Sequence, residues 1–222
     1  MWPSWVASHA ALAAGAHAGG TREWAAPAPD QLVRGVCEDC AGGWIDALGA
    51  QAEPLVRAIL ADETTPLGED DQRTLGAWAL LQAVMCALDT AAAPLFPASH
   101  VEELYRSAAT QPAAPEAVSV DLFRYGGARW SAFHRAHPLT LTFGGGVGPP
   151  DTPAYGITFT LGRVGFQLFG VSVADLHIDR RDNKLGRRLV RQIWPFRRTV
   201  VWPISPALDD EQLVALADSF AG

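Results

Sequence analysis

Hydrophobic residues recur at helical spacing through the first half of the chain. Over residues 44–60, apolar side chains three or four positions apart would share one face of a helix, which Pro54 would bend or break. Residues 68–88 begin with acids, which the positive end of a helix dipole favours, and continue apolar nearly all round. This segment predicts a helix in the core. Two further helices are predicted, over residues 4–18 and over residues 99–107, whose first serine, Ser99, would be the N-cap.

The apolar spacing shortens after residue 115, where short runs typical of strands follow one another. Gly162 and Arg163 separate two of these runs and predict a tight hairpin. Asp209 and Gln212 have the spacing of a capping box, which predicts a closing helix. The strands are predicted over residues 118–125, 132–135, 140–143, 155–161 and 165–173.

These patterns together predict an α+β fold. Residues 1–112 would form a helical region with a C-x2-C remnant, and residues 113–222 an antiparallel sheet with a C-terminal helix. We expect the two regions to pack as one compact unit, because 222 residues are enough to bury a sizeable core.

The composition indicates which partners and which cellular compartment the protein favours. Its 17 basic and 24 acidic residues give a net charge of −7, so the overall field does not favour nucleic acid. Three cysteines, one of them isolated, do not make the disulfide framework of a secreted protein, which favours a reducing cytoplasm. No run reaches the roughly 18 apolar residues that a membrane span needs. We therefore expect a soluble, cytoplasmic protein.

Cys37 and Cys40 stand at the C-x2-C spacing with which two thiols grip one tetrahedral zinc ion. They supply half of such a site, and the remaining cysteine, Cys86, lies in an apolar run where it is expected to be a small hydrophobic core residue. His9 and His17 precede the pair and are close enough in sequence to complete a zinc site. The alternative is a vestigial thiol pair packed beneath a tryptophan.

The same stretch carries a resemblance to a known family. Trp2-Pro3-Ser4-Trp5 and Cys37-Glu38-Asp39-Cys40-Ala41-Gly42-Gly43-Trp44 resemble the front of actinobacterial HNH-endonuclease-like (His-metal finger) proteins. Members usually read C-x2-C, then Glu-His-Val-x-Pro-x-Trp, then C-x2-C-Asn-x-Gly-Trp. Outside this motif the resemblance covers most of the chain by pattern.

The departures from the family decide what the resemblance implies. In such a nuclease the histidine activates water, a metal steadies the phosphate and the asparagine orients the histidine. This chain has no counterpart of the first cysteine pair or of the Glu-His, and Ala41 stands in the place of the asparagine. The resemblance implies a degenerate member that has lost the nuclease centre and binds nucleic acid or a partner protein. An active nuclease with a misassigned start is the alternative within the family.

Residues 180–198 concentrate positive charge, with eight cations and the single acid Asp182. The segment has a net charge of +7, which suits a phosphate backbone, and Trp194 and Phe196 are placed to stack on bases. A solvated surface paired with acids elsewhere is the alternative. The predicted nucleic-acid-binding residues are Arg180, Arg181, Lys184, Arg187, Arg188, Arg191, Trp194, Arg197 and Arg198.

An enzyme with unrelated chemistry is the other class of function that the sequence leaves open. Its site would lie in a pocket between the helical half and the sheet. His177 and Asp179 are the catalytic candidates, because a strand would place both side chains on one face. No residue set in the sequence identifies a reaction.

Overall fold

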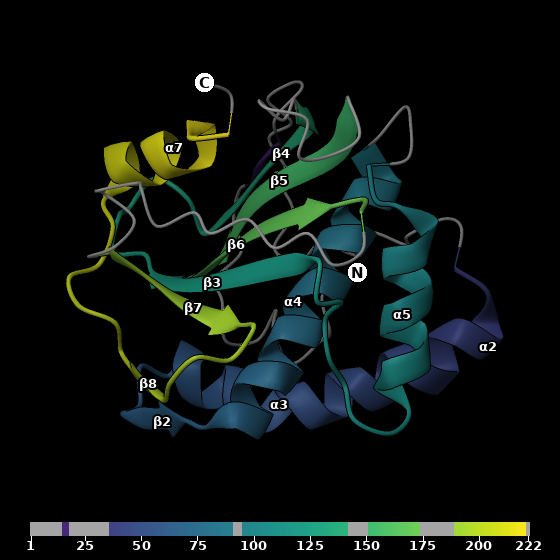
Figure 1. The fold of residues 1–222 in the computed structure, drawn as a ribbon. Helices are drawn as coiled ribbons and strands as arrows, with labels where there is room; N and C mark the ends of the chain where they lie inside the picture. Colours follow the sequence, from purple (N-terminus) through teal and green to yellow (C-terminus); the bar gives the residue numbers. More distant parts are fainter. Residues whose placement is uncertain (1–14, 18–35, 91–94, 142–150, 174–188, 221–222) are drawn as a thin grey trace.

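The computed structural model describes residues 15–17, 36–90, 95–141, 151–173 and 189–220 (Figure 1). It shows an α+β fold with helices first, a mainly antiparallel sheet after them and a closing helix, as the sequence predicts. The helices of the first half are α2 (Glu38–Cys40), the π-helical turn η1 (Ala41–Ile45), α3 (Asp46–Leu60), α4 (Glu69–Thr90) and α5 (Ala98–Ala108). None of the helices in the described part of the chain is both long and apolar enough to cross a bilayer.

Helix α3 continues through Pro54, so the proline does not break it. Proline cannot donate to the carbonyl of Ala50, but both residues lie on the exposed side of the helix, where solvent has access to that carbonyl. The opposite side is buried and contains Leu48, Ala52, Val56 and Ile59. The amphipathic pattern read from the sequence therefore fixes how α3 faces the core.

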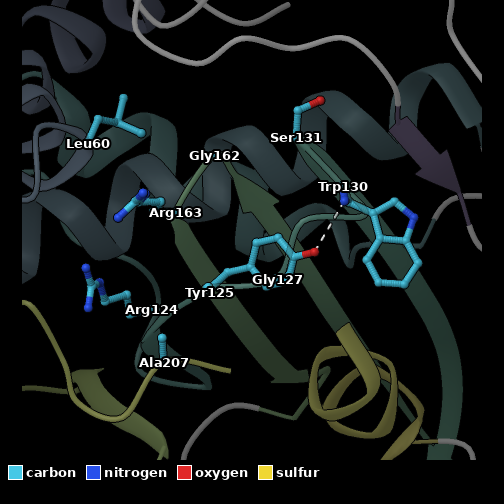
Figure 2. A pocket seen from close by; sticks show the side chains of 10 residues that line it. Leu60, Arg124, Tyr125, Gly127, Trp130, Ser131, Gly162, Arg163 and Ala207 are labelled. Atoms are coloured by element: carbon cyan, nitrogen blue, oxygen red, sulfur yellow. Dashed lines mark hydrogen bonds between the residues drawn. The ribbon is translucent and has the colours of Figure 1, made fainter. Parts of the chain in front are cut away.

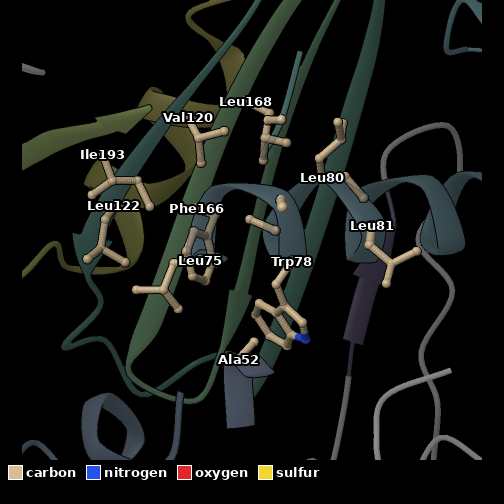
Figure 3. Close-up of a cluster of buried hydrophobic side chains, with 14 of the residues drawn as sticks. Ala52, Leu75, Trp78, Leu80, Leu81, Val120, Leu122, Phe166, Leu168 and Ile193 are labelled. Carbon is tan, nitrogen blue, oxygen red and sulfur yellow. The ribbon is translucent and has the colours of Figure 1, made fainter. Parts of the chain in front are cut away.

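Helix α4 is the centre of the main core, as its nearly continuous apolar sequence predicts. Trp78 is fully buried and packs edge-on against Phe166 of the sheet, with the ring centroids 5.9 Å apart. Figure 3 shows side chains of α4 meeting those of the sheet, including Leu122 and Leu168. The helical region and the sheet region thus share one core.

Within the described residues, the main sheet contains six strands in the order β1-β4-β5-β6-β3-β7. The five strands from β4 to β7 pair antiparallel, whereas β1 adds to the edge in parallel with β4. The strands are β1 (Gly15–His17), β3 (Val118–Arg124), β4 (Ala132–Leu141), β5 (Thr152–Leu161), β6 (Val164–Val171) and β7 (Val190–Trp194). The hairpin predicted at Gly162 and Arg163 joins β5 to β6.

Helix α7 (Asp210–Asp218) covers the face of the sheet opposite α4 (Figure 1). The predicted capping box is present, because Asp209 accepts from the Gln212 N–H and the Gln212 side chain accepts from the Asp209 N–H. Leu213 and Leu216 of α7 pack on Phe123 of β3. Alternate residues of β3 thus serve two separate cores.

One helix prediction and one strand prediction need correction. Residues 15–17, predicted as the end of an Ala-rich helix, form β1, because pairing with β4 supplies backbone hydrogen bonds that override the local helical propensity. The two short strands predicted over residues 132–135 and 140–143 are one strand, β4, as far as Leu141. Pro138 is tolerated because β1 reaches only His134, so no described strand pairs with the other side of β4 at the proline.

The start of α5 also differs from the prediction. The N-cap is Pro97, whose side chain makes no capping hydrogen bond, and Ser99 lies inside the helix. Capping chemistry gives only a preference, so the first residue of a helix can differ by one or two positions from the one that the sequence favours.

A second, two-stranded sheet was not predicted. It pairs β2 (Thr65–Leu67) with β8 (Val200–Trp202) in antiparallel fashion. Buried Gln72 of α4 ties this sheet to the core, because its side-chain amide donates to the carbonyls of Leu67 at 2.7 Å and Arg198 at 2.9 Å. The backbone at Arg198 is therefore held against the first turn of α4.

Candidate functional site

Cys37 and Cys40 lie side by side at the start of α2. The backbone N–H of Cys40 donates to the Cys37 sulfur at 3.3 Å, and both thiols are free rather than joined in a disulfide. The hydrogen bond with the Cys40 side chain, followed by the one from its N–H, lowers the pKa of Cys37. The same side-chain contact raises the pKa of Cys40, while Trp44 acts in the opposite direction. Cys37 is thus the thiol more readily ionised.

The remaining predicted zinc ligands cannot be placed around this pair. His9 lies outside the described residues, and only the backbone of His17, in β1, is described. Among the residues that the structure describes, no three His, Cys, Asp or Glu side chains gather as a metal site would require. Zinc binding by Cys37 and Cys40 stays a prediction.

Two arginines from the described part of the basic segment line a small hollow beside β8. Its volume is about 220 Å³, and Arg191 of β7 and Arg198 line it together with apolar and hydroxyl side chains and no acid. Arg197 and Arg198 are exposed, and Arg191 is half-buried, with Nη1 donating to the Val190 carbonyl at 2.9 Å. We call Arg191, Arg197 and Arg198 the arginine surface.

Trp194 has a structural role that the sequence did not reveal. Its indole N–H donates to the carbonyl of Pro115 at 3.1 Å, and the tryptophan packs on α4 at Gly76. A side chain at Gly76 would stand 3.1 Å from the Trp194 Cβ, so the glycine permits the close approach of β7 to the helix. Base stacking by Trp194 remains untested, but the indole is already engaged by the fold.

Other predicted site residues lie outside the described part of the chain. They are His177, Asp179, Arg180, Arg181, Lys184, Arg187 and Arg188.

A larger pocket occurs near the junction of the helical region and the sheet (Figure 2). Its volume is about 520 Å³, and its lining comes from the end of α3, the end of β3 with the following loop, the β5–β6 turn and Ala207. Arg124 and Arg163 are the charged residues of this lining. We call it the Arg124–Arg163 pocket. The sequence led us to expect a pocket near this junction, but it did not indicate these residues.

Asp62 is an acid that forms ion pairs with the two arginines of the pocket. Its Oδ2 accepts from Nη2 of Arg124 and lies 3.6 Å from Nη1 of Arg163. Asp62 follows α3 in the left-handed backbone region, with φ of 60°, a conformation that aspartate tolerates better than most residues. The sequence predicts a turn at Gly162 and Arg163, but only the packing of α3 on the sheet brings that turn to Asp62.

Tyr125 lines the same pocket and is anchored at its hydroxyl. The hydroxyl donates to Oδ1 of Asp210 and accepts from the Trp130 N–H at 3.2 Å. Burial and the bond to Asp210 raise the pKa of Tyr125 to about 12. The bond from Tyr125 lowers the pKa of Asp210. The hydroxyl is therefore a neutral structural link between β3 and α7 rather than an acid or base ready for chemistry.

Comparison of the chain with protein-family models, with curated proteins and with solved structures gave no match.

Proposed function

We propose that this protein is a degenerate HNH-endonuclease-like protein that binds nucleic acid through the arginine surface without cutting it. The observation that carries the proposal is the hollow beside β8, which has two arginines, Arg191 and Arg198, and no acid among its lining residues. A guanidinium group can donate two parallel hydrogen bonds to the oxygens of one phosphate, so two arginines beside this hollow favour binding of a phosphate backbone.

The loss of cleavage rests on Ala41, at the start of η1 directly after Cys40. Its methyl group cannot accept or donate a hydrogen bond, so it cannot orient a catalytic histidine as the family's asparagine would. The helices after this position pack into the core, so the substitution at Ala41 leaves a folded protein. Binding without cleavage is therefore the activity that the residues favour.

The arginine surface would bind by charge rather than by sequence. The protein carries a net charge of −7, so repulsion from the remainder of the molecule opposes binding and salt screens the local attraction quickly. The logarithm of the binding constant falls linearly with the logarithm of the salt concentration, and each neutralised phosphate makes this slope steeper by about 0.7–0.9. The arginine surface alone predicts a slope of roughly 2–3.

The test measures binding of the full chain to labelled single-stranded and duplex DNA of unrelated sequences over a salt series. Replacing both exposed arginines (Arg197→Gln with Arg198→Gln) is expected to weaken binding of every sequence and to reduce the slope by about 2. The matched control removes the same charge from α3 and α5 (Arg57→Gln with Arg106→Gln) and should leave the slope unchanged.

Two outcomes would count against the proposal. Absence of binding to DNA and RNA at low salt would show that the arginine surface does not bind nucleic acid, and a partner protein would become the better hypothesis. Equal weakening by the control pair would show a response to total charge rather than to this surface.

A further inference from the structure

The Arg124–Arg163 pocket has the size and the composition of a small-molecule site. Its volume of about 520 Å³ falls within the range of roughly 300–1,000 Å³ typical of such sites. The apolar part of the wall comes from Leu60, Tyr125 and Trp130. Figure 2 shows the side chains of Arg124 and Arg163 on the same side of the Tyr125 ring as Leu60. The pocket therefore combines a cationic end with room for an apolar body.

The charge at the cationic end is a single positive unit. Arg124 and Arg163 contribute two positive charges, and Asp62 offsets one of them. Neither Asp62 nor Asp210 lines the pocket, but Asp62 pairs with its arginines, whereas the Asp210 carboxylate accepts from the Tyr125 hydroxyl and the Arg129 N–H. A ligand with one negative charge would neutralise this end, whereas a doubly charged one would leave an excess.

The arginines keep hydrogen-bonding capacity that the protein does not use. Arg163 is 65% exposed and touches Asp62 only at 3.6 Å, so its guanidinium is available at the mouth of the pocket. Arg124 is held by Asp62 through one nitrogen, and its buried Nε has no partner among the described residues. Asp62 thus fixes Arg124 in place while Arg163 remains able to close on a ligand.

We propose that the Arg124–Arg163 pocket binds a small monocarboxylate with a flat apolar body. Arg163 pairs with the carboxylate, Arg124 supplies the fixed positive field behind it, and the body lies along Leu60 and the Tyr125 ring. A carboxylate matches both the fork geometry of a guanidinium and the single charge of the site. This ligand site is independent of the arginine surface.

The experiment titrates the full chain at low salt with three probes that share one ring: benzoate, phenyl phosphate and neutral benzamide. Calorimetry measures affinity, and the amide NMR signals of Gly126, Gly127 and Gly162 report the place of binding, because these glycines line the pocket. Benzoate is expected to bind roughly tenfold or more tightly than benzamide, as one charge-assisted hydrogen bond provides. It should also bind more tightly than phenyl phosphate.

Variants connect this binding to the named residues. Arg163→Gln should weaken benzoate about tenfold, with Arg163→Lys intermediate, and the exposed Arg163 can be changed without removing a core side chain. Arg106→Gln on α5 removes an equally exposed charge elsewhere and should have no effect. Failure of benzoate to shift the three glycines, equal binding by Arg163→Gln, or tighter binding of phenyl phosphate would each overturn the proposal.

Discussion

The arginine surface and the Arg124–Arg163 pocket use the same side chain in opposite ways. The arginines of the surface lie within eight positions of one another, and Arg197 and Arg198 project into solvent. In the pocket, Arg124 is paired with an acid 62 positions away and is only 25% exposed. An exposed charge attracts any phosphate and is weakened by salt, whereas a partly desolvated charge paired with an acid discriminates between ligands. The surface therefore suits general binding, and the pocket suits selective binding.

The largest expected effect tests whether Trp194 belongs to the fold or to the binding surface. Trp194→Leu removes the indole bond to Pro115 and part of the packing on α4, so we expect a loss of roughly 2–4 kcal/mol in the free energy of unfolding, measured with urea. Affinity for single-stranded DNA should stay the same under folding conditions. A stacking residue would instead cost about 1–3 kcal/mol of binding. Such a loss of binding, together with an unchanged free energy of unfolding, would show that Trp194 stacks on bases.

A smaller effect is expected when the free energy of unfolding is compared between a variant of the pocket and a variant of the arginine surface. Asp62→Asn keeps a residue that tolerates the positive φ but leaves Arg124 without its counter-charge, so we expect a loss of roughly 1–3 kcal/mol. The double change Arg197→Gln with Arg198→Gln should alter stability by no more than about 0.5 kcal/mol. Similar values for the two variants in urea unfolding would mean that the pocket arginine is no more fixed than the exposed ones.

The smallest effect concerns how the free energy of unfolding depends on pH through Tyr125, which lines the pocket. Folding raises the pKa of Tyr125 from its ordinary value of 10 to about 12, so the folded state favours the neutral hydroxyl. This stabilisation is present below pH 10 and is lost as the pH rises through about 12. Tyr125→Phe should reduce the fall in stability between pH 8 and pH 11 in urea unfolding. Some fall should remain, because burial also raises the pKa of Tyr155. An identical fall in the two proteins would contradict this assignment.

The sequence by itself determined the elements whose signals are local. Helix α4, which has 22 residues, follows from acids at its start and a largely apolar stretch after them, and the β5–β6 hairpin follows from Gly162 and Arg163 between two strand-like runs. The capping box at Asp209 and Gln212 is a contact over three positions, which any chain with those residues can make. These features depend on neighbours along the chain, so a single sequence is enough to read them.

Only the tertiary structure decided the features that depend on distant partners. Residues 15–17 form a strand because β4 supplies hydrogen bonds, and Trp194 is a packing residue because α4 and Pro115 lie beside it. The Arg124–Arg163 pocket has no sequence signal, since Asp62, β3 and the β5–β6 turn meet only when α3 packs against the sheet. The fold thus decides which acid pairs with Arg124, whereas the order of residues along the chain places that acid 62 positions away.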